Sequence, residues 1–141
     1  MAALSCILLV DDDETTNFLN QALLRRMAIT EAVLVAQNGR EALDLLHIHC
    51  EQAASPTCPA LVLLDMKMPV MNGLQFLEAY SQRPLARNPS IVIVMLTTSL
   101  NPVDVAQMQR LPIAGYLTKP LTTEKLQQVL HEHFGHAAPT I

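Results

Sequence analysis

Five short runs of apolar residues recur along this chain, and helical stretches separate them. Each run is apolar at every position rather than at alternate positions, which is typical of parallel strands buried on both faces of a sheet. The runs cover residues 6–10, 32–36, 61–64 and 91–96, with a weaker one at 114–117. The pattern therefore predicts five strands of one parallel sheet.

The intervals between the runs have the periodicity of amphipathic helices. Apolar residues recur at spacings of three and four in residues 18–27, for example. Further helices are predicted to begin near Asn38 and Gly39, Gly73, Asn101 and Pro102, and Thr122 or Thr123. Strands that alternate with helices predict an α/β fold with right-handed crossovers. The commonest small arrangement is the flavodoxin-like (βα)5 three-layer sandwich with strand order 2-1-3-4-5.

Length and composition indicate one globular domain. A chain of 141 residues is long enough for one core and too short for two ordinary ones, and 50% hydrophobic residues make disorder improbable. We expect a single domain over residues 1–141, with a core from 5 to 134 and a tail that frays after His131. The segment 50–59 is longer than its connection requires. We expect no further domain after the last predicted helix.

Charge and cysteine content exclude several classes of function. The net charge of −4 argues against nucleic-acid binding through phosphate neutralisation. No apolar stretch approaches the ~20 residues of a membrane span. A secretory signal requires a basic residue before its apolar run, and this chain has none there. Cys6, Cys50 and Cys58 are odd in number and irregularly spaced, which predicts reduced thiols. We therefore expect a soluble cytoplasmic protein without nucleic-acid or membrane partners.

Acidic residues follow two of the predicted strands. Asp11 and Asp12 come directly after the first apolar run, and Asp65 follows the third. In the order 2-1-3-4-5 these two strands are neighbours, so the three carboxylates converge where open α/β sheets bind ligands. Their repulsion is tolerable only if a hard divalent cation lies among them or if one acid has a raised pKa. The sequence therefore predicts a magnesium site.

A hydroxyl and a cation complete the set. Thr97 follows the fourth strand, and Lys119 follows the fifth. A carboxylate nucleophile with Mg²⁺, a cation and a hydroxyl donor is what phosphoryl transfer to an aspartate requires. One such residue alone is explained as the polar start of a loop, but that explanation fits poorly when all of them lie at strand ends.

At this point the chain resembles a response-regulator receiver domain, similar to the stand-alone chemotaxis regulator. The matching motifs run from about residue 6 to residue 134, and their order at successive strand ends makes the match specific. They are Val10-Asp11-Asp12, Asp65-x-x-Met68-Pro69-x-x-x-Gly73, Thr97 with the small residues after it, and Tyr116-x-x-Lys119-Pro120.

The resemblance implies a phosphoacceptor and a metal site. Asp65 would accept a phosphoryl group from the phosphohistidine of a sensor histidine kinase or of a histidine phosphotransfer protein in a phosphorelay. Asp12 and Asp65 would ligate Mg²⁺, Asp11 would hold a metal-bound water, and the backbone carbonyl of Lys67 would be a further ligand.

It also implies a switch. Lys119 would pair with the phosphoryl oxygens, and its peptide bond to Pro120 would be cis. Thr97 would bind another phosphoryl oxygen. Thr97 and Tyr116 would then move together and change the shape of the face formed by the fourth helix, the fifth strand and the fifth helix. This face would bind an unknown target protein or a second copy of the chain. Lys67 and Thr98 are both bulky beside the path of a water in line with phosphorus, so we expect a phosphoryl lifetime longer than that of the fast chemotaxis type.

Two alternatives remain open. Asp11-x-Asp13-x-Thr15 resembles the nucleophile motif of haloacid-dehalogenase-type phosphohydrolases, although no acidic pair follows Lys119 to hold the metal. An inert flavodoxin-like interaction module is the other. The receiver interpretation expects catalysis of the protein's own phosphorylation and dephosphorylation but no other enzyme activity. His47, His49 and Cys50, with Cys58, lack a recognised zinc-ligand spacing, and the two histidines are interpreted as surface residues near a loop.

Overall fold

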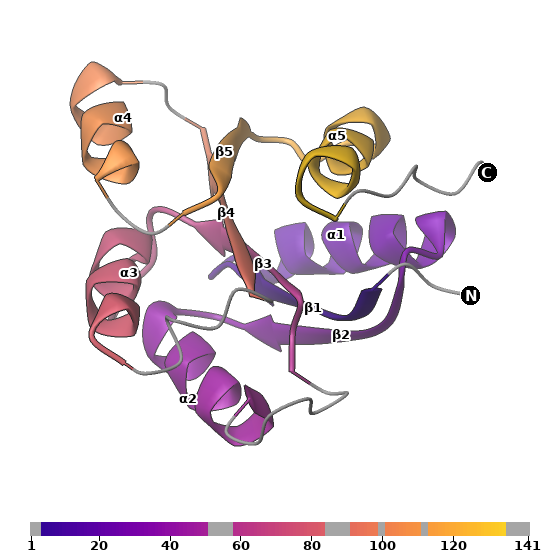
Figure 1. The fold of residues 1–141 in the computed structure, drawn as a ribbon, viewed down its shortest axis with the longest axis horizontal. Coiled ribbons are helices and arrows are strands. Elements are labelled where there is room, and N and C mark those ends of the chain that lie inside the picture. The colour runs from indigo at the N-terminus through magenta and orange to yellow at the C-terminus, as the bar shows by residue number, and fades with distance from the viewer. Residues whose placement is uncertain (1–3, 51–57, 84–90, 99–100, 111–112, 135–141) are drawn as a thin grey trace.

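The computed structural model describes residues 4–50, 58–83, 91–98, 101–110 and 113–134. Within them, strands and helices alternate along the chain (Figure 1). The strands are β1 (Leu4–Val10), β2 (Thr30–Ala36), β3 (Leu61–Asp65), β4 (Val92–Thr97) and β5 (Gly115–Thr118). The helices are α1 (Glu14–Met27), α2 (Gly39–Cys50), α3 (Gly73–Ser81), α4 (Pro102–Gln109) and α5 (Thr123–Phe134).

The five strands form one parallel sheet in the order β2-β1-β3-β4-β5. This confirms the predicted flavodoxin-like arrangement. The register pairs Val10 of β1 with Leu64 of β3, so the residues that follow these two strands start side by side. It also pairs Thr97 of β4 with Thr118 of β5. The sheet therefore brings the polar residues after β1, β3, β4 and β5 to a common edge.

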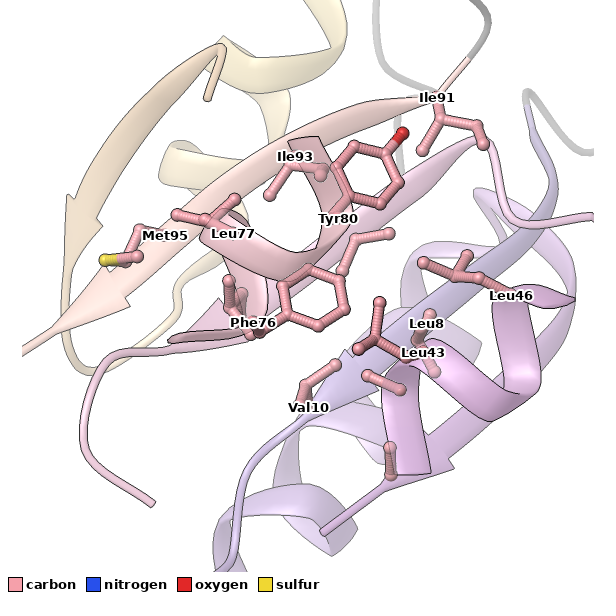
Figure 2. Close-up of a cluster of buried hydrophobic side chains, with 14 of the residues drawn as sticks. Leu8, Val10, Leu43, Leu46, Phe76, Leu77, Tyr80, Ile91, Ile93 and Met95 are labelled. Carbon is pink, nitrogen blue, oxygen red and sulfur yellow. The ribbon is translucent and has the colours of Figure 1, made fainter. Parts of the chain in front are cut away.

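Helices cover both faces of the sheet. α1 and α5 lie on one side, while α2 and α3 lie on the other (Figure 1). Alternate residues of β1 enter opposite cores: Ile7 packs with the α1 and α5 side chains, and Leu8 with those of α2 and α3. Figure 2 shows the second core, in which the Phe76 and Tyr80 rings of α3 stack with centroids 5.8 Å apart. Burial on both faces explains the uninterrupted apolar runs of the central strands β1, β3 and β4, whereas the edge strands β2 and β5 are only partly buried.

Side-chain caps fix where the helices begin. Asp13 caps α1 by accepting a hydrogen bond from the backbone of Thr15, and Asn72 forms a capping box with Gln75 at α3. Asn101 caps α4 as predicted. At α5 the capping hydroxyl belongs to Thr122. α5 continues to Phe134, so the prediction that the chain frays after His131 is wrong by three residues.

The prediction of three reduced thiols is wrong for two of them. Cys50 and Cys58 form a disulfide with a Cα–Cα distance of 4.6 Å, while Cys6 is a free buried thiol. The pairing arises because α2 ends at Cys50 and the chain returns to the start of β3 just after Cys58, a proximity that sequence spacing does not reveal. Most of the long segment 50–59 lies outside the described residues. Among the described helices, none is long and apolar enough to cross a membrane.

Candidate functional site: an acidic cluster at the sheet edge

Three carboxylates meet where β1 and β3 end. Asp11 and Asp12 follow Val10, and Asp65 is the last residue of β3. One oxygen of each carboxylate lies within 4.8 Å of the others. Asp11 and Asp65 are buried, whereas Asp12 is exposed. The strand order thus brings these three side chains together, as the sequence predicts.

Hydrogen bonds hold Asp11 at every polar group. Its backbone N–H donates to the carbonyl of Ala36 at 3.0 Å, and its backbone carbonyl accepts from Asn17 Nδ2 at 2.8 Å. In the carboxylate, Oδ1 accepts from the N–H of Asp13 at 2.9 Å, and Oδ2 accepts from Lys119 Nζ at 2.8 Å. Asp11 is therefore fixed in orientation before any ligand binds.

Lys119 reaches the cluster from the end of β5. Its ammonium lies 2.8 Å from Asp11 Oδ2 and 3.2 Å from Asp65 Oδ1. Its backbone N–H donates to the carbonyl of Thr97 at 2.8 Å, and the bond to Pro120 is cis, as predicted. Burial lowers the pKa of Lys119, but the hydrogen bond and charges of the two carboxylates outweigh burial and leave that pKa raised. Lys119 is therefore held as a cation.

Asp65 is the carboxylate of the cluster whose negative charge is unfavourable in its surroundings. Burial raises the pKa of its carboxyl group, and the charge of Asp11 raises it further, while Lys119 acts in the opposite direction. A single lysine thus does not fully offset the repulsion. A divalent cation between the carboxylates would offset the rest.

The donor set fits a hard cation. All three side chains supply carboxylate oxygens, the ligands that Mg²⁺, Ca²⁺ and Mn²⁺ prefer. Mg²⁺ binds oxygens at about 2.1 Å, so ligands on opposite sides of the ion are about 4 Å apart, and it usually keeps several waters. Oxygens within 4.8 Å of one another suit such a partly hydrated ion. Among the described residues, no other group of three or more His, Cys, Asp or Glu side chains offers a metal site.

Comparison with known proteins decides the family. The family described as the response regulator receiver domain matches residues 7–131 of the chain. The response regulator Rcp1 of Synechocystis is 36% identical over 114 residues, which cover 80% of this chain and 75% of Rcp1. The chain belongs to the response regulator receiver family. It is thus a domain of two-component signalling.

Solved structures agree with this assignment. The crystal structure of a two-component response regulator from Cytophaga hutchinsonii matches with a TM-score of 0.80 at 25% identity and covers 93% of this chain and 97% of that one. The Mn²⁺-bound form of response regulator Rcp1 matches with a TM-score of 0.71 at 30% identity and covers 96% of this chain and 99% of that one.

The receiver's remaining predicted residues surround the cluster at different depths. Thr97 is buried at the end of β4, and Thr98 after it is exposed. Lys67, two residues after Asp65, is exposed. Tyr116 lies on β5 opposite Met95 and is 38% exposed, so its ring is at the surface in this structure.

The loop from β3 to α3 approaches the backbone at the end of β3 closely. The backbone N–H of Gly73 donates to the carbonyl of Met66 at 2.9 Å, and a Cβ at Gly73 would lie 2.6 Å from the carbonyl oxygen of Asp65. This close approach explains why the receiver motif has glycine at this position. Val70 in the same loop is 81% exposed and has φ of 65°, a conformation that β-branched residues rarely adopt.

An open groove of about 500 Å³ lies between α1 and the loop that follows β5, and it reaches the site at Lys119. Leu19 and Leu23 of α1 line one side, and Leu121 lines the other. Phe18 and Leu19 are 70% and 59% exposed. The receiver therefore presents an apolar surface beside the entrance to its acidic cluster.

Asn17 is the site residue that sequence reasoning missed. It is a buried polar residue in α1 that donates a hydrogen bond to the backbone of the loop that bears Asp11 and Asp12. The available signal was a polar residue one turn after the cap Asp13, but such a residue looks like any solvent-facing position of an amphipathic helix.

Proposed function

We propose that Asp65 of this receiver accepts a phosphoryl group from a phosphohistidine on a sensor histidine kinase or a histidine phosphotransfer protein. An Asp65 oxygen attacks phosphorus, the P–N bond breaks, and the imidazole nitrogen keeps the electron pair. The observation that carries the proposal is the position of Asp65, which is buried between two further carboxylates and Lys119.

The metal roles follow from which oxygens are already engaged. Among the described residues, no group bonds the carboxylate of exposed Asp12, so it is available as a direct ligand together with Asp65. Both carboxylate oxygens of Asp11 already accept hydrogen bonds, so Asp11 is suited to hold a metal-bound water. The backbone carbonyl of Lys67 supplies a further ligand. When bound, Mg²⁺ neutralises charge on the phosphoryl oxygens. The Mn²⁺-bound structure of the related protein Rcp1 supports the proposal that a divalent cation binds here.

Lys119 and Thr97 bind the transferred group in this proposal. The ammonium that pairs with Asp65 would shift to a phosphoryl oxygen, and the Thr97 hydroxyl would donate to another. The movement of Thr97 would bias the position of Tyr116 and so alter the face of α4, β5 and α5. That face would contact the downstream target or a second phosphorylated copy.

The partner that donates the phosphoryl group must approach over the site. Leu19 lines the groove that ends at Lys119 and is 59% exposed, so we place the donor's docking surface there. A histidine kinase draws on ATP, which supports a cytoplasmic location.

The phosphohydrolase alternative has less support. It needs Asp13 near the reacting group as an acid, but the Asp13 side chain is exposed and accepts hydrogen bonds from Thr16 and Thr15. These hydrogen bonds lower the pKa of Asp13, which is the wrong direction for a general acid.

Acetyl phosphate labelling followed by mass spectrometry tests the proposal. Wild-type protein should gain a base-labile phosphoryl group at Asp65 only when Mg²⁺ is present, Asp65→Asn should gain none, and Asp12→Ala should need much more Mg²⁺. Asp13→Asn is the matched control, because asparagine also caps helices well and the residue lies outside the cluster. Label that persists in Asp65→Asn, or label on Asp11, would refute the assignment, and no label on wild type would favour an inert module.

A further inference from the structure

We propose that Asn17 is a positioning residue for the metal ligands, acting through its hydrogen bond to the backbone between Asp11 and Asp12. This inference deepens the proposed function and rests on it. Asn17 lies in α1, four residues after the cap Asp13, and its backbone N–H donates to the Asp13 carbonyl at 3.0 Å. The helix therefore carries this side chain back under the loop that bears the carboxylates.

The contact fixes one peptide unit of that loop. Asn17 Nδ2 donates to the carbonyl oxygen of Asp11 at 2.8 Å. This carbonyl belongs to the peptide that joins Asp11 to Asp12, so its orientation sets the direction in which both carboxylates leave the backbone. The other groups of Asp11 are bonded to Ala36, Asp13 and Lys119, which leaves Asn17 as the group that defines this peptide plane.

The side-chain oxygen of Asn17, Oδ1, argues against a purely structural role for this residue. Asn17 is 4% exposed, and among the described residues its Oδ1 is a buried side-chain atom without a hydrogen-bond partner. Reversing the amide would not help, because Oδ1 would then face the Asp11 carbonyl, and two acceptors would meet. A buried unpaired oxygen is unfavourable for folding. An apolar residue of the same size would remove this unpaired oxygen and would also lose the bond to Asp11, so the two effects oppose each other in stability.

Metal affinity is where the loss should appear. Groups that orient metal ligands typically contribute 10–100-fold to affinity even though they do not touch the ion. Asn17→Leu should therefore weaken Mg²⁺ binding about 10-fold in calorimetric titration, while the melting temperature in EDTA shifts by no more than about 3 °C. In acetyl phosphate labelling, the Mg²⁺ concentration for half-maximal rate should rise about 10-fold, and the rate at saturating Mg²⁺ should be retained.

Asn20→Leu is the matched control. Asn20 is a buried asparagine on the same helix that lines the groove, and in the described part of the chain it has no hydrogen bond to residues 11–13. It should keep wild-type Mg²⁺ affinity. If Asn17→Leu does not fold, Asn17→Ala and Asn20→Ala replace the pair with the same expected contrast.

The outcomes separate the two proposals. Wild-type affinity in Asn17→Leu, or an equal loss in both variants of a pair, would overturn the positioning role and leave the metal site intact. A wild-type protein that binds no Mg²⁺ would overturn the metal site and the positioning role together.

Discussion

Replacing Lys119 with methionine is the sharpest test of the site's electrostatics. Among the described residues, both salt bridges of the acidic cluster are made by Lys119. Methionine has a similar length and no charge. In the absence of divalent cations, the variant would therefore leave three carboxylates close together without the ammonium that now offsets their repulsion.

The size of the effect follows from the distances. At an effective dielectric constant of about 20, the ammonium attracts Asp11 at 2.8 Å by about 6 kcal/mol and Asp65 at 3.2 Å by about 5 kcal/mol. Burying the ammonium costs several kcal/mol, which removes much of this gain. Breaking a buried pair from one side typically lowers stability by about 3–5 kcal/mol, and we expect Lys119→Met to lie in that range in EDTA.

The deficit should depend on pH. Burial and the Asp11 charge raise the pKa of Asp65, so the native protein binds this proton more tightly than the unfolded chain does. The contribution of Asp65 to the free energy of unfolding therefore falls as pH rises from its unfolded value of 3.8 through its raised native value. Without Lys119 the native pKa rises further. The gap between wild type and variant should thus be largest near neutral pH and should narrow as pH falls toward 4.

Urea unfolding followed by circular dichroism measures the difference in free energy of unfolding between wild type and Lys119→Met. The measurement is made in EDTA and in Mg²⁺. Each is repeated near neutral pH and at a pH about one to two units above the reference pKa of Asp65. Lys125→Met is the matched control, because Lys125 donates to the carbonyls of Thr118 at 2.6 Å and Pro120 at 2.9 Å rather than to a carboxylate. It should lose about 1 kcal/mol at either pH. Mg²⁺ should stabilise Lys119→Met more than wild type. A Lys119→Met protein as stable as wild type in EDTA, or one that follows the control at both pH values, would refute the reasoning.

Three further predictions concern the loop and the switch. Val70→Gly should raise the free energy of unfolding by about 1 kcal/mol in urea titrations, because glycine adopts a φ of 65° without the penalty that valine has there. Lys67→Asn should shorten the phosphoryl lifetime measured by loss of label, because a smaller side chain admits water in line with phosphorus; an unchanged rate would count against shielding by Lys67. Paired structures with and without beryllofluoride should show different Thr97 and Tyr116 rotamers, and identical rotamers would mean that this receiver signals by another route.

Much of the fold could be predicted because its central strands, β1, β3 and β4, are largely buried on both faces. Uninterrupted apolar runs such as that of β3 identify parallel strands, and the polar residue that ends each run marks the functional edge. Asp65 illustrates this, since it is both the last residue of β3 and the candidate acceptor. Once the strand order was assumed, the meeting of Asp65 with Asp11 followed from topology alone.

The contacts that sequence reasoning missed depend on which segments of the chain lie next to each other in the folded protein. The pairing of Cys50 with Cys58 requires the end of α2 and the start of β3 to approach each other, and no spacing rule encodes this. Asn17 was missed for a related reason: its partner is a backbone carbonyl, which has no signature in the sequence. Residues that act through the backbone are therefore invisible to motif reasoning even when they lie beside the motif.

The backbone bond between β4 and β5 gives the proposed switch a physical connection. The N–H of Lys119 donates to the carbonyl of Thr97, so the two residues proposed to bind the phosphoryl group are joined before it arrives. A ligand shifts a conformational equilibrium only by its differential affinity for the two states. A phosphoryl group on Asp65 would supply this difference, because it offers new acceptors to the Lys119 ammonium and the Thr97 hydroxyl at once. Tyr116 lies three residues before Lys119, within the four-residue strand β5, so a shift of the strand end has little backbone over which to be absorbed before it reaches the exposed ring.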